Sequence, residues 1–531
     1  MKQRKYFDCF ASVGKPAIPD SNFPSDIETI KNDMSYSRIH AVAAIHNAAR
    51  DYSLTYGNRL GLEISKKESR IHSISAVNPF IEYETEYKDY YYDLLKNGSV
   101  GFAVLQNAIH SGSLEPKSYR KIVEPLMEFS KPLCIMGVFP EEMFKKVDTL
   151  AGEYPELPII MQGTHWCVER FLFEILNKHD NVYFEISQNQ SNSILELTKN
   201  NFGIHRVLYS SEWPLRSMGA IKALIEYADI TDEEKDLVSH GNACRLFGVS
   251  SDELPLYDDA FCELDSFAKQ CDEGKTITER VIDPHSHIVG NNEYIKGTVL
   301  IDADYKSISD KMDRLGINTT ITAPWIGISY DGTKGNEESL EANRDMPDKF
   351  LAFSCCNVNN KGELEQTIKY HDKYPDVFVG IKPYPPYLKF KLTDDVCAPW
   401  FEYANEHKLI ALIHADSPEY ADDVDILCEK YPDIIFILAH SGASYAIAEK
   451  NCSVAKKHKN VVLDITYTSC LRGMVEFLVS EVGADKVLFA TDMPMRDPAP
   501  QLGWVCYAKI SANDKNKLLS ENILRILKTR K

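Results

Sequence analysis

Short apolar runs, many of them rich in β-branched residues, alternate with amphipathic stretches from about residue 281 onward. The runs lie at 281–287, 318–324, 350–357, 377–383, 409–415, 434–440, 461–467 and 487–494. The stretches between them have helical periodicity, as at 400–408 and 420–431. Continuous apolar strands separated by helices predict a parallel sheet that is covered on both faces. Eight such units in about 250 residues favour a closed (β/α)8 barrel. An open doubly wound sheet is the alternative, but no glycine-rich phosphate-binding fingerprint follows the first strand.

The first half of the chain has the same rhythm, with apolar runs at 5–11, 39–46, 71–78, 100–105, 132–138, 158–163, 182–187 and 207–211. Short sequence motifs of the first half also recur in the second half, at a spacing of about 280 residues. Tyr154-Pro155-Glu156-Leu157 corresponds to Tyr431-Pro432-Asp433-Ile434, and Ser211-Glu212-Trp213-Pro214 corresponds to Thr491-Asp492-Met493-Pro494. We predict an α/β protein that consists of two tandem (β/α)8 TIM barrels, at residues 1–250 and 281–531, with a linker at 251–280.

A chain of 531 residues is too long to fold around one hydrophobic core, so two domains are expected. Its hydrophobic content of 44% is typical of a globular protein. The sequence has no apolar stretch of about 20 residues and no signal-peptide core, so we expect a cytoplasmic protein without a membrane partner. With a net charge of −19 and no long Lys/Arg cluster, nucleic-acid binding is not expected. The 13 scattered cysteines predict reduced, buried thiols. A homo-oligomer is left open.

Candidate metal ligands follow the strands of the second half, at the ends where barrels place their functional groups. His285 and His287 lie one residue apart, so both imidazoles point to the same face of a strand. Such ligands suit Zn²⁺ and also Mn²⁺, Fe²⁺ or Co²⁺. The predicted ligands are His285, His287, His414, His440 and Asp492.

The chemistry of such a centre predicts roles for its residues. A cation held by imidazoles lowers the pKa of a bound water to about 7. Asp492 could accept that proton and return it, and His440 could bind the metal, orient the water or polarise a substrate carbonyl. A substrate pocket with aromatic walls and cations for a carboxylate is predicted from Lys382, Tyr384, Tyr387, Trp325 and Arg496.

Other polar residues of the second half have simpler interpretations. Asp283 lies deeper on the strand that carries the histidine pair, so we predict a structural role, with orientation of a ligand as the alternative. His371, His407 and His458 lie in helical or loop stretches and are predicted to be surface residues.

The phrase Asp283-Pro284-His285-Ser286-His287, followed by His414, His440 and Asp492, resembles the amidohydrolase superfamily. Ala439-His440-Ser441-Gly442 and Thr491-Asp492-Met493-Pro494 are most similar to its amidohydrolase-related branch, which includes hydrolases, lactonases and decarboxylases of the aminocarboxymuconate-semialdehyde type. The resemblance implies a (β/α)8 barrel with one or two divalent metals. It also implies two alternatives for Lys382, a carbamylated bridge between metals or a cation that holds a substrate carboxylate or forms a structural ion pair.

These observations predict a metal-dependent hydrolase of a small amide, ester or lactone, with Asp492, His440 and Lys382 as catalytic residues. The first alternative is a non-oxidative decarboxylase or other lyase with the same ligands. The second is a sensor or assembly subunit that keeps the metal without turnover.

The first half lacks this ligand set. Its first strand reads Phe7-Asp8-Cys9-Phe10-Ala11-Ser12, its fourth has Ala103 at the lysine position, and its fifth ends in Met136-Gly137-Val138. His165 is displaced by about two residues and Glu212 replaces the aspartate. About three protein ligands are needed for a catalytic metal, so we predict that the first barrel holds none.

Overall fold

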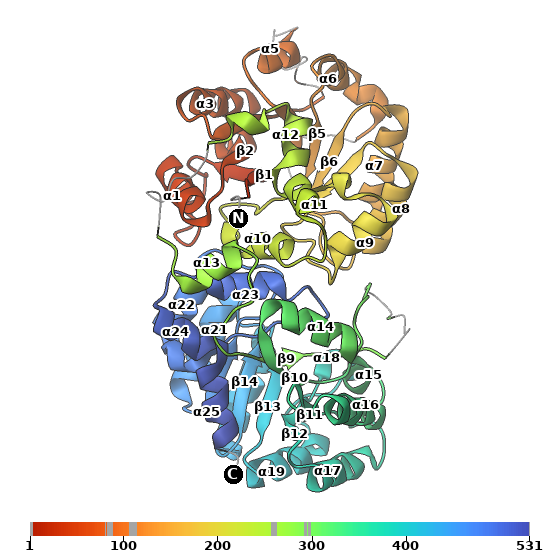
Figure 1. Cartoon of the computed structure of the whole chain (residues 1–531), viewed down its shortest axis with the longest axis vertical. Coiled ribbons are helices and arrows are strands. Elements are labelled where there is room, and N and C mark those ends of the chain that lie inside the picture. The colour runs from red at the N-terminus through yellow and green to blue at the C-terminus, as the bar shows by residue number, and fades with distance from the viewer. Residues whose placement is uncertain are drawn as a thin grey trace. The chain divides into compact units, whose positions relative to one another are not determined.

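The computed structural model describes residues 4–79, 81, 89–105, 114–255, 263–290, 295 and 299–529. The chain divides into two compact units, one made chiefly of Met1–Leu264 and the other of Asp265–Ile295 and Leu300–Lys531. Within each unit, strands occupy the centre and helices surround them (Figure 1). Each unit contains one sheet of eight parallel strands in sequence order. The predicted fold of two tandem (β/α)8 TIM barrels is therefore confirmed.

The strands of the first barrel are β1 (Phe7–Val13), β2 (Ala41–His46), β3 (Ile71–Ala76), β4 (Gly101–Leu105), β5 (Leu133–Met136), β6 (Ile159–Gln162), β7 (Val182–Glu185) and β8 (Val207–Leu208). Hydrogen bonds between β1 and the residues that follow β8 close the sheet. The N–H groups of Cys9 and Ser12 donate to the carbonyl oxygens of Tyr209 and Trp213, at 3.1 and 2.8 Å.

The strands of the second barrel are β9 (Val281–Ser286), β10 (Ile317–Thr322), β11 (Phe350–Ser354), β12 (Phe378–Ile381), β13 (Ile410–His414), β14 (Ile435–Ala439), β15 (Val461–Asp464) and β16 (Val487–Leu488). The last strand again returns to the first. The N–H of His287 donates to the carbonyl of Met493 at 2.7 Å, and the N–H of Asp492 donates to that of His285 at 2.8 Å. Closure thus brings the residues after β16 beside the end of β9.

Helices cover both barrels. Those of the first are α1 (Ile27–Ser37), α2 (Asn47–Asp51), α3 (Leu54–Lys67), α5 (Tyr90–Lys96), α6 (Pro116–Glu128), α7 (Glu141–Glu153), α8 (Glu169–Lys178), α9 (Ile194–Asn201), α10 (Met218–Glu226), α11 (Asp232–Asp236) and α12 (Asn242–Phe247). Those of the second unit are α13 (Ser266–Asp272), α14 (Tyr305–Leu315), α15 (Trp325–Ser329), α16 (Gly332–Asp345), α17 (Glu363–Lys373), α18 (Pro385–Leu388), α19 (Ala398–Glu406), α20 (Pro418–Lys430), α21 (Tyr445–Lys457), α22 (Met474–Val482), α23 (Ala499–Cys506), α24 (Ala512–Asn516) and α25 (Asn522–Lys528). Polar caps start many of them, such as Asp26 for α1, Asp304 for α14 and Ser444 for α21.

The predicted boundaries differ from the observed ones where local bonding departs from the apolar pattern. Strand β16 ends at Leu488, although its apolar run continues to residue 494. The reason is that the N–H of Phe489 donates to the carbonyl of Leu518 at 2.9 Å and not to a neighbouring strand. Helix α20 begins earlier than predicted, because Pro418 occupies its first turn, where a missing N–H costs little.

The two barrels repeat each other in detail, as expected for a duplication. Asn242 donates its side-chain amide to the carbonyls of Ile204 and Val207 at 3.1 and 2.8 Å. Asn522 makes the same two bonds to Ala484 and Val487, at 2.7 and 2.9 Å. A π-helical turn precedes each asparagine, at Leu237–Gly241 and Lys517–Glu521.

Side-chain exposure confirms some predictions and corrects one. Among the described cysteines none forms a disulfide, and all except Cys167 are buried. His407 is exposed as predicted, but His371 is buried, so that prediction was wrong. One nitrogen of His371 contacts the Ser354 hydroxyl and the Gly380 carbonyl at 2.8 and 3.1 Å, because α17 packs its inner face against the sheet. In the part of the chain that the structure describes, no helix combines the length and apolar character needed to cross a membrane.

Candidate metal centre

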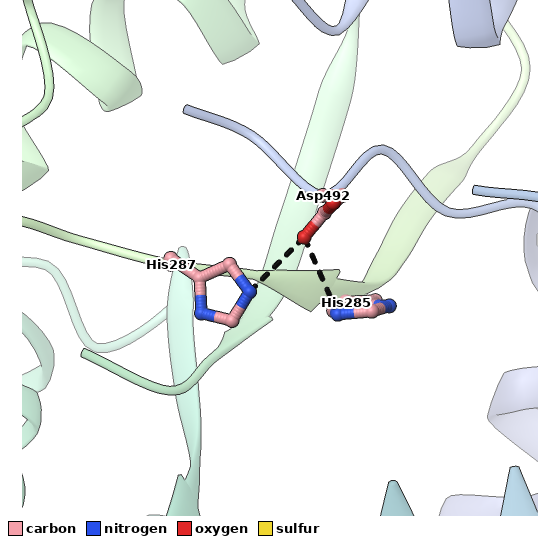
Figure 2. A group of neighbouring side chains, drawn as sticks. All are labelled: His285, His287 and Asp492. Carbon is pink, nitrogen blue, oxygen red and sulfur yellow. Dashed lines mark hydrogen bonds and ion pairs between the residues drawn. The ribbon is translucent and has the colours of Figure 1, made fainter. Parts of the chain in front are cut away.

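Two histidines and one aspartate meet at the carboxyl end of the second barrel. His285 is the last residue but one of strand β9 and His287 follows directly after that strand, while Asp492 lies in the segment after β16. Figure 2 shows both imidazoles directed at one carboxylate oxygen of Asp492. The Asp492 Oδ1 atom lies 3.0 Å from Nε2 of His287 and 3.5 Å from Nε2 of His285. All three side chains are buried.

This spacing fits a divalent cation. One donor atom from each of these three residues lies within 4.8 Å of the others. Metal–ligand bonds of about 2.1 Å place neighbouring donors about 3.0 to 3.4 Å apart, depending on octahedral or tetrahedral geometry. The two distances to Asp492 fall close to that range. Two imidazoles and a carboxylate also form the kind of donor set that Zn²⁺ and Mn²⁺ accept.

Fixed hydrogen bonds orient both rings. Nδ1 of His287 lies 2.7 Å from the carbonyl oxygen of Ala323. A carbonyl only accepts, so this nitrogen carries the proton and leaves the lone pair of Nε2 for the centre. Nδ1 of His285 lies 2.9 Å from Oδ2 of Asp464, and burial lowers the pKa of His285 well below its usual value. A neutral imidazole of this kind can act as a metal ligand.

Asp464 is the residue that the sequence analysis missed. Its Oδ1 accepts the backbone N–H groups of His440 and Thr466 at 2.9 and 3.1 Å, which leaves Oδ2 for His285. Burial raises the pKa of this carboxyl, and the hydrogen bonds oppose that shift. One signal in the sequence could have revealed it, since Asp464 is a single acid inside the otherwise uncharged run 461–467.

His414 and His440 lie beside the three-residue group and outside it. The ring centroid of His440 is 5.1 Å from that of His285 and 4.4 Å from that of His414. Nδ1 of His440 lies 3.2 Å from the carbonyl of Thr466, and Nε2 of His414 lies 3.1 Å from Oδ1 of Asp416. Their predicted role as metal ligands therefore stays a prediction.

Asp492 is held in place from two sides. Nη2 of Arg496 donates to its Oδ2 at 3.0 Å, and its backbone has a φ of 62°, in the left-handed region. Arg496, together with the imidazoles of His287 and His285, outweighs burial and holds the pKa of Asp492 well below its usual range. The residue is therefore an anionic donor at neutral pH.

Asp283 fastens the segment that carries Asp492. Its Oδ1 accepts the N–H groups of His285 and Thr491, both at 3.1 Å, and its Oδ2 accepts the Thr491 hydroxyl at 2.5 Å. Burial raises the pKa of Asp283 to about 7. These contacts are those of the structural role predicted for it.

Lys382 is buried at the centre of the site. Its Nζ lies 3.2 Å from Nε2 of His285 and 5.6 Å from the ring centroid of Tyr384. Burial lowers the pKa of Lys382 to about 8, and the carboxylates of Asp492 and Asp464 oppose that shift.

Aromatic rings form one wall beside these groups. The centroid of Trp325 is 6.0 Å from that of His287 and 5.4 Å from that of Tyr387. Tyr387 stacks on Tyr384 with centroids 5.6 Å apart, and Tyr384 in turn contacts His414 at 5.3 Å. The residues predicted to bind substrate therefore adjoin the predicted ligands.

A family model described as amidohydrolase matches residues 96–249 and 368–529, which is more than half of the chain. The chain belongs to the amidohydrolase family. One matched stretch lies in each barrel, and the second contains His414, His440 and Asp492. No curated protein matches the sequence.

The amidohydrolase chain is also similar to several solved structures. These include 5-carboxyvanillate decarboxylase from Novosphingobium aromaticivorans in complex with manganese, with 15% identity and a TM-score of 0.39, over 47% of this chain and 96% of that one. A 2,6-dihydroxybenzoate decarboxylase from Rhizobium has 17% identity and a TM-score of 0.36, over 47% and 99%. A 4-oxalomesaconate hydratase from Rhodopseudomonas palustris has 18% identity and a TM-score of 0.36, over 47% and 96%.

In the first amidohydrolase barrel, Asp8 marks the position of Asp283. Its Oδ1 accepts the N–H groups of Phe10 and Ser211, both at 3.1 Å, as Asp283 accepts those of His285 and Thr491. The N–H of Ser12 then donates to Trp213 as that of His287 donates to Met493. Phe10 and Ser12 thus stand where the second barrel has His285 and His287.

The remaining ligand positions follow from strand pairing. Ala103, Met136 and Gly163 take the places of Lys382, His414 and His440, and Glu212 takes that of Asp492. His165 is exposed and lies beyond the end of its strand. The absence of a catalytic metal from this barrel stays a prediction, and its side chains support it.

Proposed function

We propose that the second barrel is a metal-dependent decarboxylase that removes CO₂ from a small, flat carboxylic acid without an oxidant. The observation that carries this proposal is a pair of buried cations, Lys382 and Arg496, set beside the candidate metal ligands.

The charges of the centre favour an anionic substrate. Lys382 and Arg496 face two carboxylates, those of Asp492 and Asp464. A bound divalent cation would add two positive charges to this buried group. Buried charge is costly unless it is compensated, so a substrate carboxylate would stabilise the loaded site. A neutral amide or ester would leave the excess positive charge in place.

The metal would be held by His285, His287 and Asp492, with His414 and His440 as neighbouring donors. It would supply a Lewis acid that withdraws electrons from a substrate oxygen. Zn²⁺, Mn²⁺, Fe²⁺ and Co²⁺ all suit these donors.

The protein side chains would orient the substrate and move the proton. Lys382 and Arg496 would hold oxygen atoms of the acid, and the stacked Tyr384 and Tyr387 would hold a flat substrate body next to Trp325. The bond between the carboxyl carbon and its neighbouring carbon would break, the electron pair would stay on the neighbouring carbon, and a proton from solvent water, relayed by Asp492, would replace the CO₂ that leaves. The support for decarboxylation comes from these side chains and not from the distant structural similarities.

The test is product analysis on the full chain loaded in turn with each metal. Aromatic and unsaturated carboxylic acids are assayed for CO₂ release in H₂¹⁸O, with their methyl esters in parallel. We expect CO₂ from the acids, the starting carbon skeleton with one added hydrogen, and no ¹⁸O in that product. Failure to release CO₂ from any acid with any metal would contradict the proposal.

A hydrolase is the second candidate, and the low pKa of Asp492 is the observation that favours it. A carboxylate that is ionised at neutral pH can accept a proton from an attacking water. The same assay separates the two functions, because hydrolysis of the esters would place ¹⁸O in the acid product and release no CO₂. Retention of metal without turnover of either set would favour a sensor or assembly subunit.

A further inference from the structure

A cavity of about 580 Å³ opens at the strand ends of the first barrel. Apolar side chains form much of its wall, among them Phe10, Leu105, Met136 and Trp213. Ser12 and Glu212 are among its polar lining residues. Ligand sites in proteins commonly have volumes of about 300 to 1,000 Å³ and mostly apolar walls.

This cavity occupies the place of the metal centre in the other barrel. Phe10 and Ser12 stand at the positions of His285 and His287, and Met136 stands at that of His414, as the backbone bonds and strand pairing establish. Each of these three imidazoles has thus been replaced by a side chain without a nitrogen donor. The first barrel thus has a cavity at its strand ends, where the second barrel has its candidate metal ligands.

The charged residues around the cavity are neutralised within the protein or face solvent. Glu212 accepts hydrogen bonds from Nε of Arg216 and from the amide of Gln188, at 2.9 and 2.7 Å. The guanidinium of Arg50 pairs with Asp51 at 2.8 Å. Asp20 is exposed at the rim. Among the lining residues that the structure describes, the basic side chain, Arg50, is paired with Asp51, so a carboxylate or phosphate would meet no uncompensated positive charge here.

Part of the rim is apolar and open to water. Ile18 is 86% exposed and Leu215 is 39% exposed, and both line the cavity. A ligand that covered them would recover part of the free energy that their hydration costs. An apolar protein cavity of about 150 Å³ can bind benzene, so this larger cavity has room for a molecule of two rings.

We propose that the first barrel is a metal-independent binding site for an uncharged, largely apolar small molecule of about two rings. The site is separate from the proposed decarboxylase centre, and its test does not depend on that activity.

The experiment measures the binding of uncharged two-ring probes, 2-naphthol and indole, to the full chain by calorimetry. The chain is treated beforehand with a chelator. Ile18→Asp places a charge at the rim without disturbing the core, and Ser12→Phe fills the cavity from the end of β1. Ile426→Asp, at an isoleucine of the second barrel that is 60% exposed, is the matched control.

We expect at least one probe to bind the chelated protein, with affinity reduced about tenfold or more by Ile18→Asp and by Ser12→Phe, and unchanged by Ile426→Asp. Circular dichroism and the metal content after reloading identify any variant that is misfolded. The proposal is overturned if neither probe binds, if chelation abolishes binding, or if folded Ile18→Asp and Ser12→Phe proteins bind as well as the wild type. Tighter binding of 2-naphthoate than of 2-naphthol would overturn the ligand class.

Discussion

The two barrels have buried acidic residues at corresponding positions, but they differ in the side chains at their strand ends, which include histidines in the second barrel. Asp8 and Asp283 make the same contacts to the first strand and to the segment after the last strand. Glu185 accepts the N–H groups of Gly163 and Ser187, as Asp464 accepts those of His440 and Thr466. Among the described residues, it is the acid of the second barrel that also contacts a histidine of the site, since Oδ2 of Asp464 lies 2.9 Å from Nδ1 of His285. The comparison teaches that these acids hold the strand ends in both barrels, whether or not histidines lie beside them.

Removing the histidine pair should have the largest effect, because it tests directly whether the second barrel differs from the first in binding a metal. We expect His285→Ala with His287→Ala to abolish stoichiometric metal binding and to lower turnover on the order of 10³-fold or more. Elemental analysis and kcat measure the two effects. Ser12→Ala, at the matching position of the first barrel, should change neither. Unchanged metal content in the double variant would show that the centre lies elsewhere.

Lys382→Met tests the cation that the first barrel replaced with Ala103. Loss of a buried charged hydrogen-bond donor should lower kcat/KM for a carboxylic acid by about 100-fold, because the acid loses its counter-charge. Kinetics on the acid, together with inhibition by its methyl ester, separate charge recognition from general damage. An equal loss of affinity for acid and ester would argue against recognition of a carboxylate.

Asp464→Asn tests whether this buried acid, which has a counterpart in the first barrel, also contributes to metal binding in the second. The variant weakens the acceptor for Nδ1 of His285, and we expect metal affinity to fall about 10- to 100-fold in competition with a chelator. Glu185→Gln changes the matching acid of the first barrel and should leave metal affinity as it is. If both variants lowered metal affinity alike, the effect would be one of overall stability.

The smallest expected effect is on the pH dependence of stability. Burial raises the pKa of Glu185 to about 7, compared with about 4.3 in an unfolded chain. Between these values the folded state binds more protons than the unfolded state, so stability falls as pH rises from about 4 to 7. We expect this loss to be on the order of 1–3 kcal/mol and to disappear in Glu185→Gln. Hydrogen exchange of peptides that cover β7, corrected for intrinsic rates, measures it, and an unchanged slope in the variant would contradict it.

Much of the fold could be predicted from the sequence, because burial on both faces of parallel strands leaves continuous apolar runs and helices leave their own period. The same pattern located His285 and His287, since two residues separated by a single residue on a strand point to the same face. The end of β16 could not be predicted, because a bond from Phe489 to the distant Leu518 sets it.

The sequence alone thus determined two barrels, a histidine pair in one of them and the loss of that pair in the other. Tertiary structure decided which polar groups meet. Asp464 reaches His285 across 179 residues of chain, and Lys382 reaches the same ring across 97. Packing also left a cavity where the first barrel lost its imidazoles. Contacts between strand ends depend on barrel closure and side-chain volume, and neither leaves a local pattern in the sequence.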